Sequence, residues 1–261
     1  MKNNVFRNIY LLVIFIFMYL PIFVLMLYSF NESRNQYIFT DFSLKWYTEI
    51  LSNQMLVDAI KTTFKIAILS TTISVIIGFS CGVGIMFLNN RYKKILITIN
   101  QIPLINPDIV TGVGLMLLFI FIRVELGFSS MLIAHIAFSI PYVVISILPR
   151  LNSLGIDLIN AGMDLGLKPR KVLSKIILPA VWPNIVTGAL IAFTMSIDDF
   201  VISYFVTGNG INNLSIWIFS QTKKGINPTA NAISSLMFVF IITLLMIYYA
   251  RQNRKEKTYE V

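Results

Sequence analysis

The chain has 261 residues, of which 56% are hydrophobic and only 13% are charged. A typical soluble domain carries about 25% charged residues, so this composition excludes a disordered chain and argues against a soluble enzyme. The formal net charge is +9.

The apolar residues are concentrated in six blocks along the chain. A helix that crosses a bilayer needs roughly 20 such residues, and helices or closed barrels are the only structures that lipid permits. The first block is longer than the roughly 7–15 apolar residues of a cleaved signal, so we expect it to be retained. We therefore predict an all-α polytopic membrane protein, a single transmembrane domain over 1–261, with spans at about 9–30, 64–88, 105–122, 131–149, 185–206 and 233–250.

Small residues repeat every four positions along the second span, at Ser70, Ser74, Gly78 and Gly82. Residues at this spacing share one face of a helix, and a small face lets two helix backbones approach closely in lipid. The pattern favours tight helix packing, with a substrate groove as the alternative.

The third span begins with Asn106-Pro107-Asp108. Asn at the N-cap, Pro at the first helical position and a carboxylate in the first turn form a helix start. The alternative for Asp108 is a contact with substrate.

Two residue types occur once each, as Cys81 and His135. A lone cysteine permits no internal disulfide, and a lone histidine offers no His cluster for a metal. We expect His135 to be an internally satisfied core residue. The sequence also lacks the G-x-x-x-x-G-K-[ST] loop and the common catalytic motifs, so we expect no cofactor, metal or nucleotide site on this chain and no enzymatic activity of its own.

The segment 150–184 is the longest predicted loop on the basic side. Asp157 is a plausible N-cap for a short helix over 158–165, and Gly166 fits the left-handed residue that follows a helix. Pro169 fits the first position of a second helix, which we expect to end near Leu178-Pro179. The segment is interpreted either as an interfacial amphipathic element or as a docking surface for a cytoplasmic partner.

Two adjacent acids, Asp198 and Asp199, lie in the fifth span. An ionised Asp at the centre of a spanning helix costs roughly 2.5–3.5 kcal/mol on insertion scales, so we expect the pair to have a functional or structural role. Neighbours on one helix point about 100° apart, so we do not expect both to face one pore. We predict that at least one lines a path for a cationic substrate; the alternative is a buried structural pair.

Lys and Arg are distributed unevenly between the predicted loops. The N-terminus, segments 89–106 and 150–184, and the tail hold 14 of them, against 6 in the remaining loops. The richer set lies inside by the positive-inside rule, so both termini are predicted to be cytoplasmic. The basic charge then reflects topology and lipid contact, and we expect no nucleic-acid partner.

The loop also resembles a known motif. Residues Asn160-Ala161-Gly162-Met163-Asp164-Leu165-Gly166, followed after nine residues by Ile176-Ile177-Leu178-Pro179, resemble the E-A-A-x3-G-x9-I-x-L-P loop of binding-protein-dependent ABC importer permeases. Asn160 replaces the usual Glu and Gly162 replaces an Ala, while the glycine and the spacing are kept. The resemblance implies the type I permease fold, with this short helix docking on a separate ATPase.

The similarity extends along nearly the whole chain toward the permeases of spermidine/putrescine importers, of the second membrane subunit type. It is carried by 29–33, 45–47, 107–110, 196–208, 225–228 and 231–232. It implies a permease subunit in a bacterial cell membrane that works with a pair of cytoplasmic ATPases, a second homologous permease and an external polyamine-binding protein. ATP would be used by the partner ATPase.

Two alternatives stay open at this point. The chain is either a permease for another solute or, in a different class, a self-sufficient secondary transporter. An anion site would need Lys or Arg, whereas the candidate residues here are acidic. The sequence also lacks the internal repeat of many secondary transporters.

Overall fold

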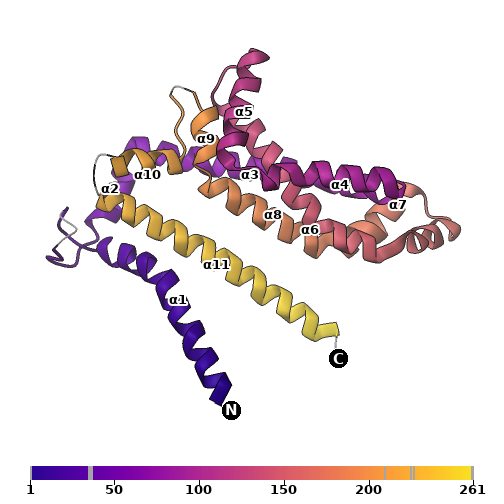
Figure 1. The fold of residues 1–261 in the computed structure, drawn as a ribbon, viewed down its shortest axis with the longest axis horizontal. Helices are drawn as coiled ribbons and strands as arrows, with labels where there is room; N and C mark the ends of the chain where they lie inside the picture. The colour runs from indigo at the N-terminus through magenta and orange to yellow at the C-terminus, as the bar shows by residue number, and fades with distance from the viewer. Residues whose placement is uncertain (1, 35–37, 209, 224, 226, 260–261) are drawn as a thin grey trace. The chain divides into compact units, whose positions relative to one another are not determined.

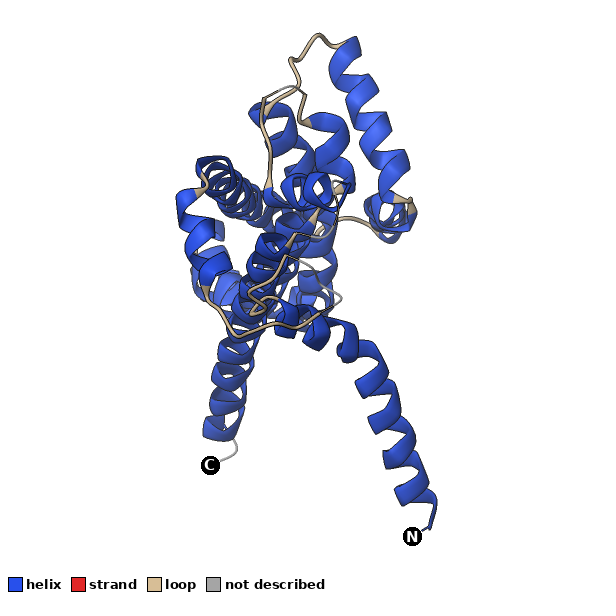
Figure 2. Cartoon of the chain, turned by 90° about the vertical axis from the view of Figure 1, so that its left-hand side faces the viewer, coloured by secondary structure: helices blue, strands red, loops and turns tan. Residues whose placement is uncertain are grey.

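The computed structural model describes the backbone of residues 2–34, 38–208, 210–223, 225 and 227–259, and their side chains except those of 2–5 and 252–259. Within this part of the chain the regular elements are all helices, as Figure 2 shows, apart from an isolated bridge between Asn31 and Phe42. The predicted all-α class is confirmed. Several residues used in the sequence argument lie outside the described residues or side chains: Lys2, Lys224, Ile226, Arg254, Lys255 and Lys257.

The chain forms two compact units, which are described separately. Unit 1 comprises Met1–Val57 with Trp217–Val261, and unit 2 comprises Asp58–Ile216. The single permease domain expected from the sequence stays a prediction.

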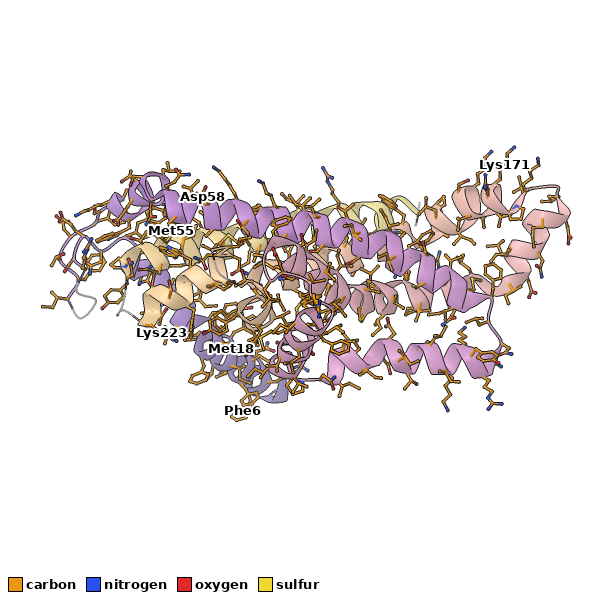
Figure 3. All side chains as sticks on the ribbon, turned by 90° about the horizontal axis from the view of Figure 1, so that it is seen from above. Phe6, Met18, Met55, Asp58, Lys171 and Lys223 are labelled. Atoms are coloured by element: carbon orange, nitrogen blue, oxygen red, sulfur yellow. The ribbon has the colours of Figure 1, made fainter. Side chains whose placement is uncertain are left out.

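Unit 1 contains the first and last long helices of the chain. They are α1 (Lys2–Tyr28) and α11 (Pro228–Tyr259). The unit also contains the short α2 (Lys45–Ser52) and most of α10 (Leu214–Lys223). Helix α11 packs against both α1 and α2, and Figures 1 and 2 show that α1 begins at the same end of the pair at which α11 ends. Most of α1 is exposed and apolar, including Phe6 and Met18 in Figure 3, which suits a helix surrounded by lipid or by another subunit.

Unit 2 contains the remaining helices. They are α3 (Gln54–Met86, whose first residues belong to unit 1), α4 (Asn90–Ile105), α5 (Asp108–Phe121), α6 (Phe128–Asp164), α7 (Pro169–Val172), the π-helix η1 (Leu173–Ile177), α8 (Leu178–Asp198) and α9 (Val201–Val206). Helices α6 and α8 lie side by side, as Figure 1 shows, and α5 packs against α9. Apolar cores hold the unit together, among them one around Ile147 and Val181, one around Phe119 and Met131, and a smaller one around Val144 and Leu148.

Within the described part of the chain, five helices are long and apolar enough to cross a membrane. They cover Phe6–Tyr28, Gln54–Met86, Phe128–Asp164, Pro169–Asp198 and Pro228–Arg251. A sixth span results if the bent pair α4 and α5 counts as one, and this matches the six predicted spans in number.

The third predicted span differs from the structure. The segment 89–106 was expected to be a loop, but Asn89 accepts a hydrogen bond from the backbone N–H of Tyr92 and thereby caps α4. Helix α4 then meets α5 at an angle of 104°. The predicted span 105–122 is therefore only the 14-residue second arm of a broken pair.

The predicted start of that arm is also wrong by one residue. Asn106 ends α4, Pro107 occupies the N-cap position without a side-chain hydrogen bond, and Asp108 is the first helical residue. Proline still suits the bend, because it has no N–H to donate and its φ is fixed near the observed −57°.

The fifth predicted span, 185–206, is not one helix. The helix that enters it begins earlier, in α7 and η1, and continues through Pro179 into α8 without the expected end at Leu178-Pro179. The Leu178 N–H bonds the carbonyl of Leu173, five residues back. Helix α8 then ends at Asp198, Asp199 is extended with φ −61° and ψ 119°, and α9 restarts at Val201.

Candidate functional site

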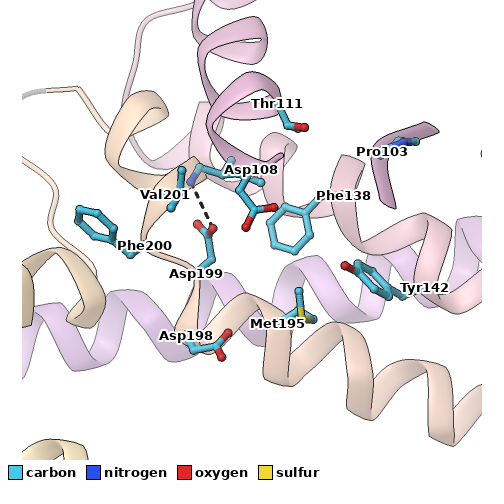
Figure 4. Close-up of a pocket in the computed structure, with 11 residues that line it drawn as sticks. Pro103, Asp108, Thr111, Phe138, Tyr142, Met195, Asp198, Asp199, Phe200 and Val201 are labelled. Atoms are coloured by element: carbon cyan, nitrogen blue, oxygen red, sulfur yellow. Dashed lines mark hydrogen bonds between the residues drawn. The ribbon is translucent and has the colours of Figure 1, made fainter. Parts of the chain in front are cut away.

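A pocket of about 270 Å³ lies beside the break between α8 and α9. All three acids named from the sequence line it: Asp108 at the start of α5, Asp198 at the end of α8, and Asp199 in the break (Figure 4). The remaining wall is largely apolar or aromatic, from Pro103, Thr111, Phe138, Tyr142, Met195, Phe200, Val201 and Ile202. Both adjacent acids border this pocket, because the helix does not continue through them. The expectation that they do not both face the substrate path stays a prediction.

The backbone of the break is held by Asp199. Its Oδ1 accepts the N–H of Ile202 at 3.2 Å, and its Oδ2 accepts the N–H of Ser203 at 2.8 Å and the Ser203 hydroxyl at 2.7 Å. A carboxylate that accepts the first free N–H groups of a helix acts as its cap. Neither glycine nor proline is present at this break, so the side chain of Asp199 itself stabilises the interruption.

A buried histidine stands behind this carboxylate. His135 of α6 is fully buried, and its Nε2 lies 2.9 Å from the Ser203 hydroxyl and 3.5 Å from Oδ2 of Asp199. Its Nδ1 lies 2.7 Å from the Ser196 hydroxyl of α8. Both ring nitrogens are thus satisfied inside the protein, as predicted.

The other two carboxylates are differently placed. Asp108 and Asp198 are exposed, and among the described residues neither makes an ion pair or a hydrogen bond with another side chain. In Figure 4 they approach the pocket from opposite sides, from α5 and from α8. They are therefore available to a ligand, whereas the side chain of Asp199 is only 9% exposed.

The composition of this pocket determines what it can bind. Among the described lining residues three are acidic and none is Lys or Arg, so the pocket favours cations. The faces of Phe138 and Tyr142, four residues apart on α6, add aromatic surface that attracts ammonium groups. The described residues contain no group of three or more His, Cys, Asp or Glu suited to holding a metal ion.

The second region of interest is the turn between α6 and α7. Helix α6 is interrupted at Gly155, with φ 70° and ψ 157°, so the short helix begins there and Asp157 lies within it rather than capping it. The helix ends at Asp164, Gly166 is left-handed with φ 83°, and Pro169 is the first residue of α7. The last two features agree with the sequence prediction.

The residues of the importer-like motif divide into an exposed and an inner set. Asn160, Ala161, Asp164, Gly166 and Pro179 are exposed. Gly162 is buried, and a Cβ there would lie 2.6 Å from Cδ1 of Ile176, so the Gly162 position tolerates little more than hydrogen while Ile176 stays in place. Leu178 and Ile176 pack against the apolar core around Ile147.

An apolar cavity of about 330 Å³ adjoins this turn. Its lining comes from α3 and the turn after it, and from α6, α7 and η1. It consists of Val83, Phe87, Ile159, Met163, Pro169, Arg170, Val172, Leu173 and Ile177. Lys171 of the same α7 turn points outward (Figure 3). The turn thus combines an apolar interior with a basic exterior.

The small residues of α3 lie where α6 and α8 approach. A Cβ on Gly78 would lie 2.8 Å from Val143, and one on Gly82 would lie 2.6 Å from Ile147. Ser74 donates to the carbonyl of Ile136 at 3.2 Å, and Ser70 lies 3.2 Å from the Ser196 hydroxyl. These contacts favour the packing interpretation over a groove.

Comparison with known proteins settles the family. The model for binding-protein-dependent transport system inner membrane components matches residues 74–258, well over half of the chain. The chain belongs to this family. It is a membrane permease subunit of ABC importers, a transport component rather than an enzyme.

Curated relatives cover almost the whole permease. It is 35% identical, over 95% of this chain and 96% of the relative, to the spermidine/putrescine transport system permease protein PotC of Haemophilus influenzae. It is 33% identical, over 98% of this chain and 94% of the relative, to the putrescine transport system permease protein PotI of Escherichia coli.

Solved structures share the fold of the permease. A chain of a bacterial alginate ABC transporter, crystallised with an alginate pentasaccharide-bound periplasmic protein, matches with a TM-score of 0.70 over 96% of this chain and 94% of that chain. The sequence identity is 15%, so this likeness shows the type I importer permease fold and nothing of the substrate.

Family membership also sets the general partners. A permease of this kind lies in the inner membrane and works with an ATPase and a binding protein.

The sequence predicted the three acids of the pocket but not Phe138, Tyr142 and Thr111. An aromatic pair at i and i+4 in an apolar helix reads as ordinary core, so only the fold reveals that it faces the acids.

Proposed function

We propose that the permease is the membrane subunit of an ATP-driven importer for polyamines such as spermidine and putrescine. The observation that carries the proposal is the pocket in which Asp108, Asp198 and Asp199 meet aromatic surface without a lining Lys or Arg. The named functions of the relatives, which are 33–35% identical over nearly the full chain, point to the same substrates.

The chemistry of a polyamine matches this pocket. Such a molecule is a flexible apolar chain with several ammonium groups, so it needs separated negative charges and apolar surface between them. Asp108 and Asp198 supply carboxylates on opposite walls, and Phe138, Tyr142 and Met195 supply the surface. Hydrogen bonds to charged groups contribute roughly 1.5–3 kcal/mol each, so each carboxylate would favour an ammonium group in the pocket.

The turn between α6 and α7 is the proposed contact with the ATPase. Its exposed residues Asn160, Ala161, Asp164 and Gly166 form the tip, while Gly162, Ile176, Leu178 and Pro179 connect that tip to the start of α8. Helix α8 ends at Asp198. Movement of the turn by the ATPase would therefore be carried along α8 to the pocket.

The assembly that we propose has four further components. A pair of cytoplasmic ATPases binds ATP, so the permease needs no cofactor of its own, and a second homologous permease completes the path. A binding protein delivers the polyamine to the outer mouth. Both termini lie in the cytoplasm, in keeping with the paired ends of α1 and α11 in unit 1 and with the positive-inside rule.

Uptake by cells tests the proposal. Cells that lack this chain but keep the other subunits receive the wild type, Asp198→Asn, or Glu125→Gln as a matched control, and the uptake of labelled spermidine and putrescine is measured. Glu125 is an exposed acid of the same unit that does not line the pocket. We expect wild type and Glu125→Gln to restore uptake and Asp198→Asn to lower it about tenfold or more, the equivalent of at least roughly 1.4 kcal/mol.

Two results would contradict the proposal. If the wild type restores uptake of neither polyamine, the substrate is another solute. If Asp198→Asn transports as fast as Glu125→Gln, the cation path runs elsewhere.

A further inference from the structure

A chain of buried hydrogen bonds runs from α3 to the pocket wall and has no part in the proposed contact with substrate. It links Ser70, Ser196, His135 and Ser203, and it ends at Oδ2 of Asp199. Each of the first four side chains is 0–1% exposed. The network therefore joins helices α3, α8, α6 and α9 behind the break without contact with solvent.

A sixth residue, Asn213, joins this network at Ser203 and Asp199. Nδ2 of Asn213 donates to the Ser203 hydroxyl at 2.8 Å and to the backbone carbonyl of Asp199 at 3.1 Å. Oδ1 of Asn213 accepts the N–H of Ile216 at 2.9 Å. The amide thus holds both the backbone of the break and its capping serine.

The donors and acceptors around Ser203 fix the role of the histidine. Ser203 has one hydroxyl hydrogen, which it donates to Asp199, and its oxygen accepts from Asn213. Nε2 of His135 must therefore carry a hydrogen and donate it toward Ser203 and Asp199. Without this donor, a buried hydroxyl and a largely buried carboxylate would lose a partner.

We infer that His135 is a positioning residue for the cation path: it holds Asp199 in the α8–α9 break, so that Asp199 shapes the pocket while Asp198 and Asp108 remain free for the substrate. This inference rests on the proposed function. It divides the adjacent acids into one structural and one substrate-facing carboxylate, because Asp199 accepts three hydrogen bonds and lies against His135.

A double-mutant cycle tests the inference in the complete importer. The permease is reconstituted in proteoliposomes with its ATPase, second permease and binding protein, and spermidine uptake is measured per assembled complex with saturating ATP and loaded binding protein. The variants are His135→Leu, His135→Gln, Asp198→Asn, and each His135 variant combined with Asp198→Asn. Normalising to assembled complex removes any loss of folded protein from the comparison.

We expect the loss of uptake caused by Asp198→Asn to depend on whether His135 is present. Asp198→Asn lowers uptake about tenfold in the wild type, but less than about threefold in His135→Leu. Once the break is no longer held, Asp198 is no longer presented to the substrate, so the two changes do not add. His135→Gln, whose amide both donates and accepts, recovers most of the uptake and most of the cost of Asp198→Asn. If His135→Leu does not assemble, Ser196→Ala removes only the hydroxyl at Nδ1 and should give the same pattern at smaller size.

The contradicting results separate this inference from the proposed function. An equal cost of Asp198→Asn in all backgrounds would overturn the positioning role of His135 and leave the cation path intact. Equal uptake by His135→Gln and His135→Leu would also overturn the positioning role of His135 and leave the cation path intact. Full uptake by Asp198→Asn in the wild-type background would overturn the proposed cation path, and this inference with it.

Discussion

Two helix interruptions in unit 2 each adjoin a cavity, and the two cavities differ in chemistry. The break after Asp198 borders a pocket with three carboxylates, whereas the turn around Gly166 borders a cavity lined almost wholly by apolar side chains. The first break is held by a capping carboxylate and a buried polar network. The second is made by backbone conformation, with glycine at φ 83° and proline opening the next helix.

This difference fits two separate tasks along one continuous helix. An ammonium-binding site needs free charge beside a rigid wall, and buried hydrogen bonds supply the rigidity. A mechanical contact needs an apolar interior that moves as one body, and Ile176 and Leu178 provide this by packing against the apolar core around Ile147. Helix α8 runs from the one region to the other, so its integrity matters to both.

The largest effect is expected from removing both free charges of the acidic pocket. Asp108→Asn combined with Asp198→Asn should lower polyamine uptake about a hundredfold, since two contacts of roughly 1.4 kcal/mol each are lost. The amount of assembled complex should stay that of wild type, because both side chains are exposed. Uptake above one tenth of wild type would remove the charge-based account of the pocket.

The reverse change, a charge placed in the apolar cavity, should act on stability. Leu173→Asp puts part of a carboxylate into a lining whose other side chains, apart from Arg170, are apolar, and should cost about 1 kcal/mol or more of unfolding free energy. Ser174→Asp, on the exposed neighbouring residue, is the matched control and should cost less than about 0.5 kcal/mol. Thermal unfolding in detergent measures both, and equal melting temperatures would contradict the apolar character assigned to this cavity.

The backbone of the turn can be tested with a single methyl group. Gly166→Ala forces a Cβ into the left-handed region and should cost about 1–2 kcal/mol, although no atom within 4 Å obstructs it. Gly114→Ala, at a helical glycine that also has open space, should be neutral or slightly stabilising. We expect Gly166→Ala alone to reduce polyamine-stimulated ATP hydrolysis by the complex; an equal effect of the two variants would show that the left-handed turn is dispensable.

The smallest effect is expected at the far end of the polar network. Ser70→Ala removes one hydroxyl that lies 3.2 Å from Ser196 and should cost about 0.5–1.5 kcal/mol of stability. Uptake per assembled complex should fall less than twofold, since His135 keeps its other contacts. A loss as large as that of Asp198→Asn would place Ser70 in the path instead.

The two interruptions also show what local sequence signals reveal. Gly166 and Pro169 have conformational preferences that act within a few residues, so the turn was predicted from them. The break at Asp199 depends on Ser203 and on His135, 64 positions earlier in the chain, and a sequence of apolar residues around two acids reads as one continuous helix. Asn89 has the side chain of an N-cap, but 89–106 was predicted only as a basic segment between two spans.

The acidic pocket was partly predictable for the same reason. Acids inside an apolar block are conspicuous because they are costly there, so Asp108, Asp198 and Asp199 could be named at once. Their meeting in one pocket depends on the bend before α5 and the break after α8. Neither follows from periodicity alone.

Substrate protection of a cysteine in the pocket tests the central claim most directly. Thr111→Cys is made in a Cys81→Ser background, so that all three carboxylates remain, and the reconstituted importer is treated with a positively charged thiol reagent during turnover. Glu125→Cys, outside the pocket, is the control. The account predicts that spermidine slows modification of Cys at position 111 and leaves position 125 unchanged; equal modification rates with and without spermidine at position 111 would contradict passage of the polyamine through the acidic pocket.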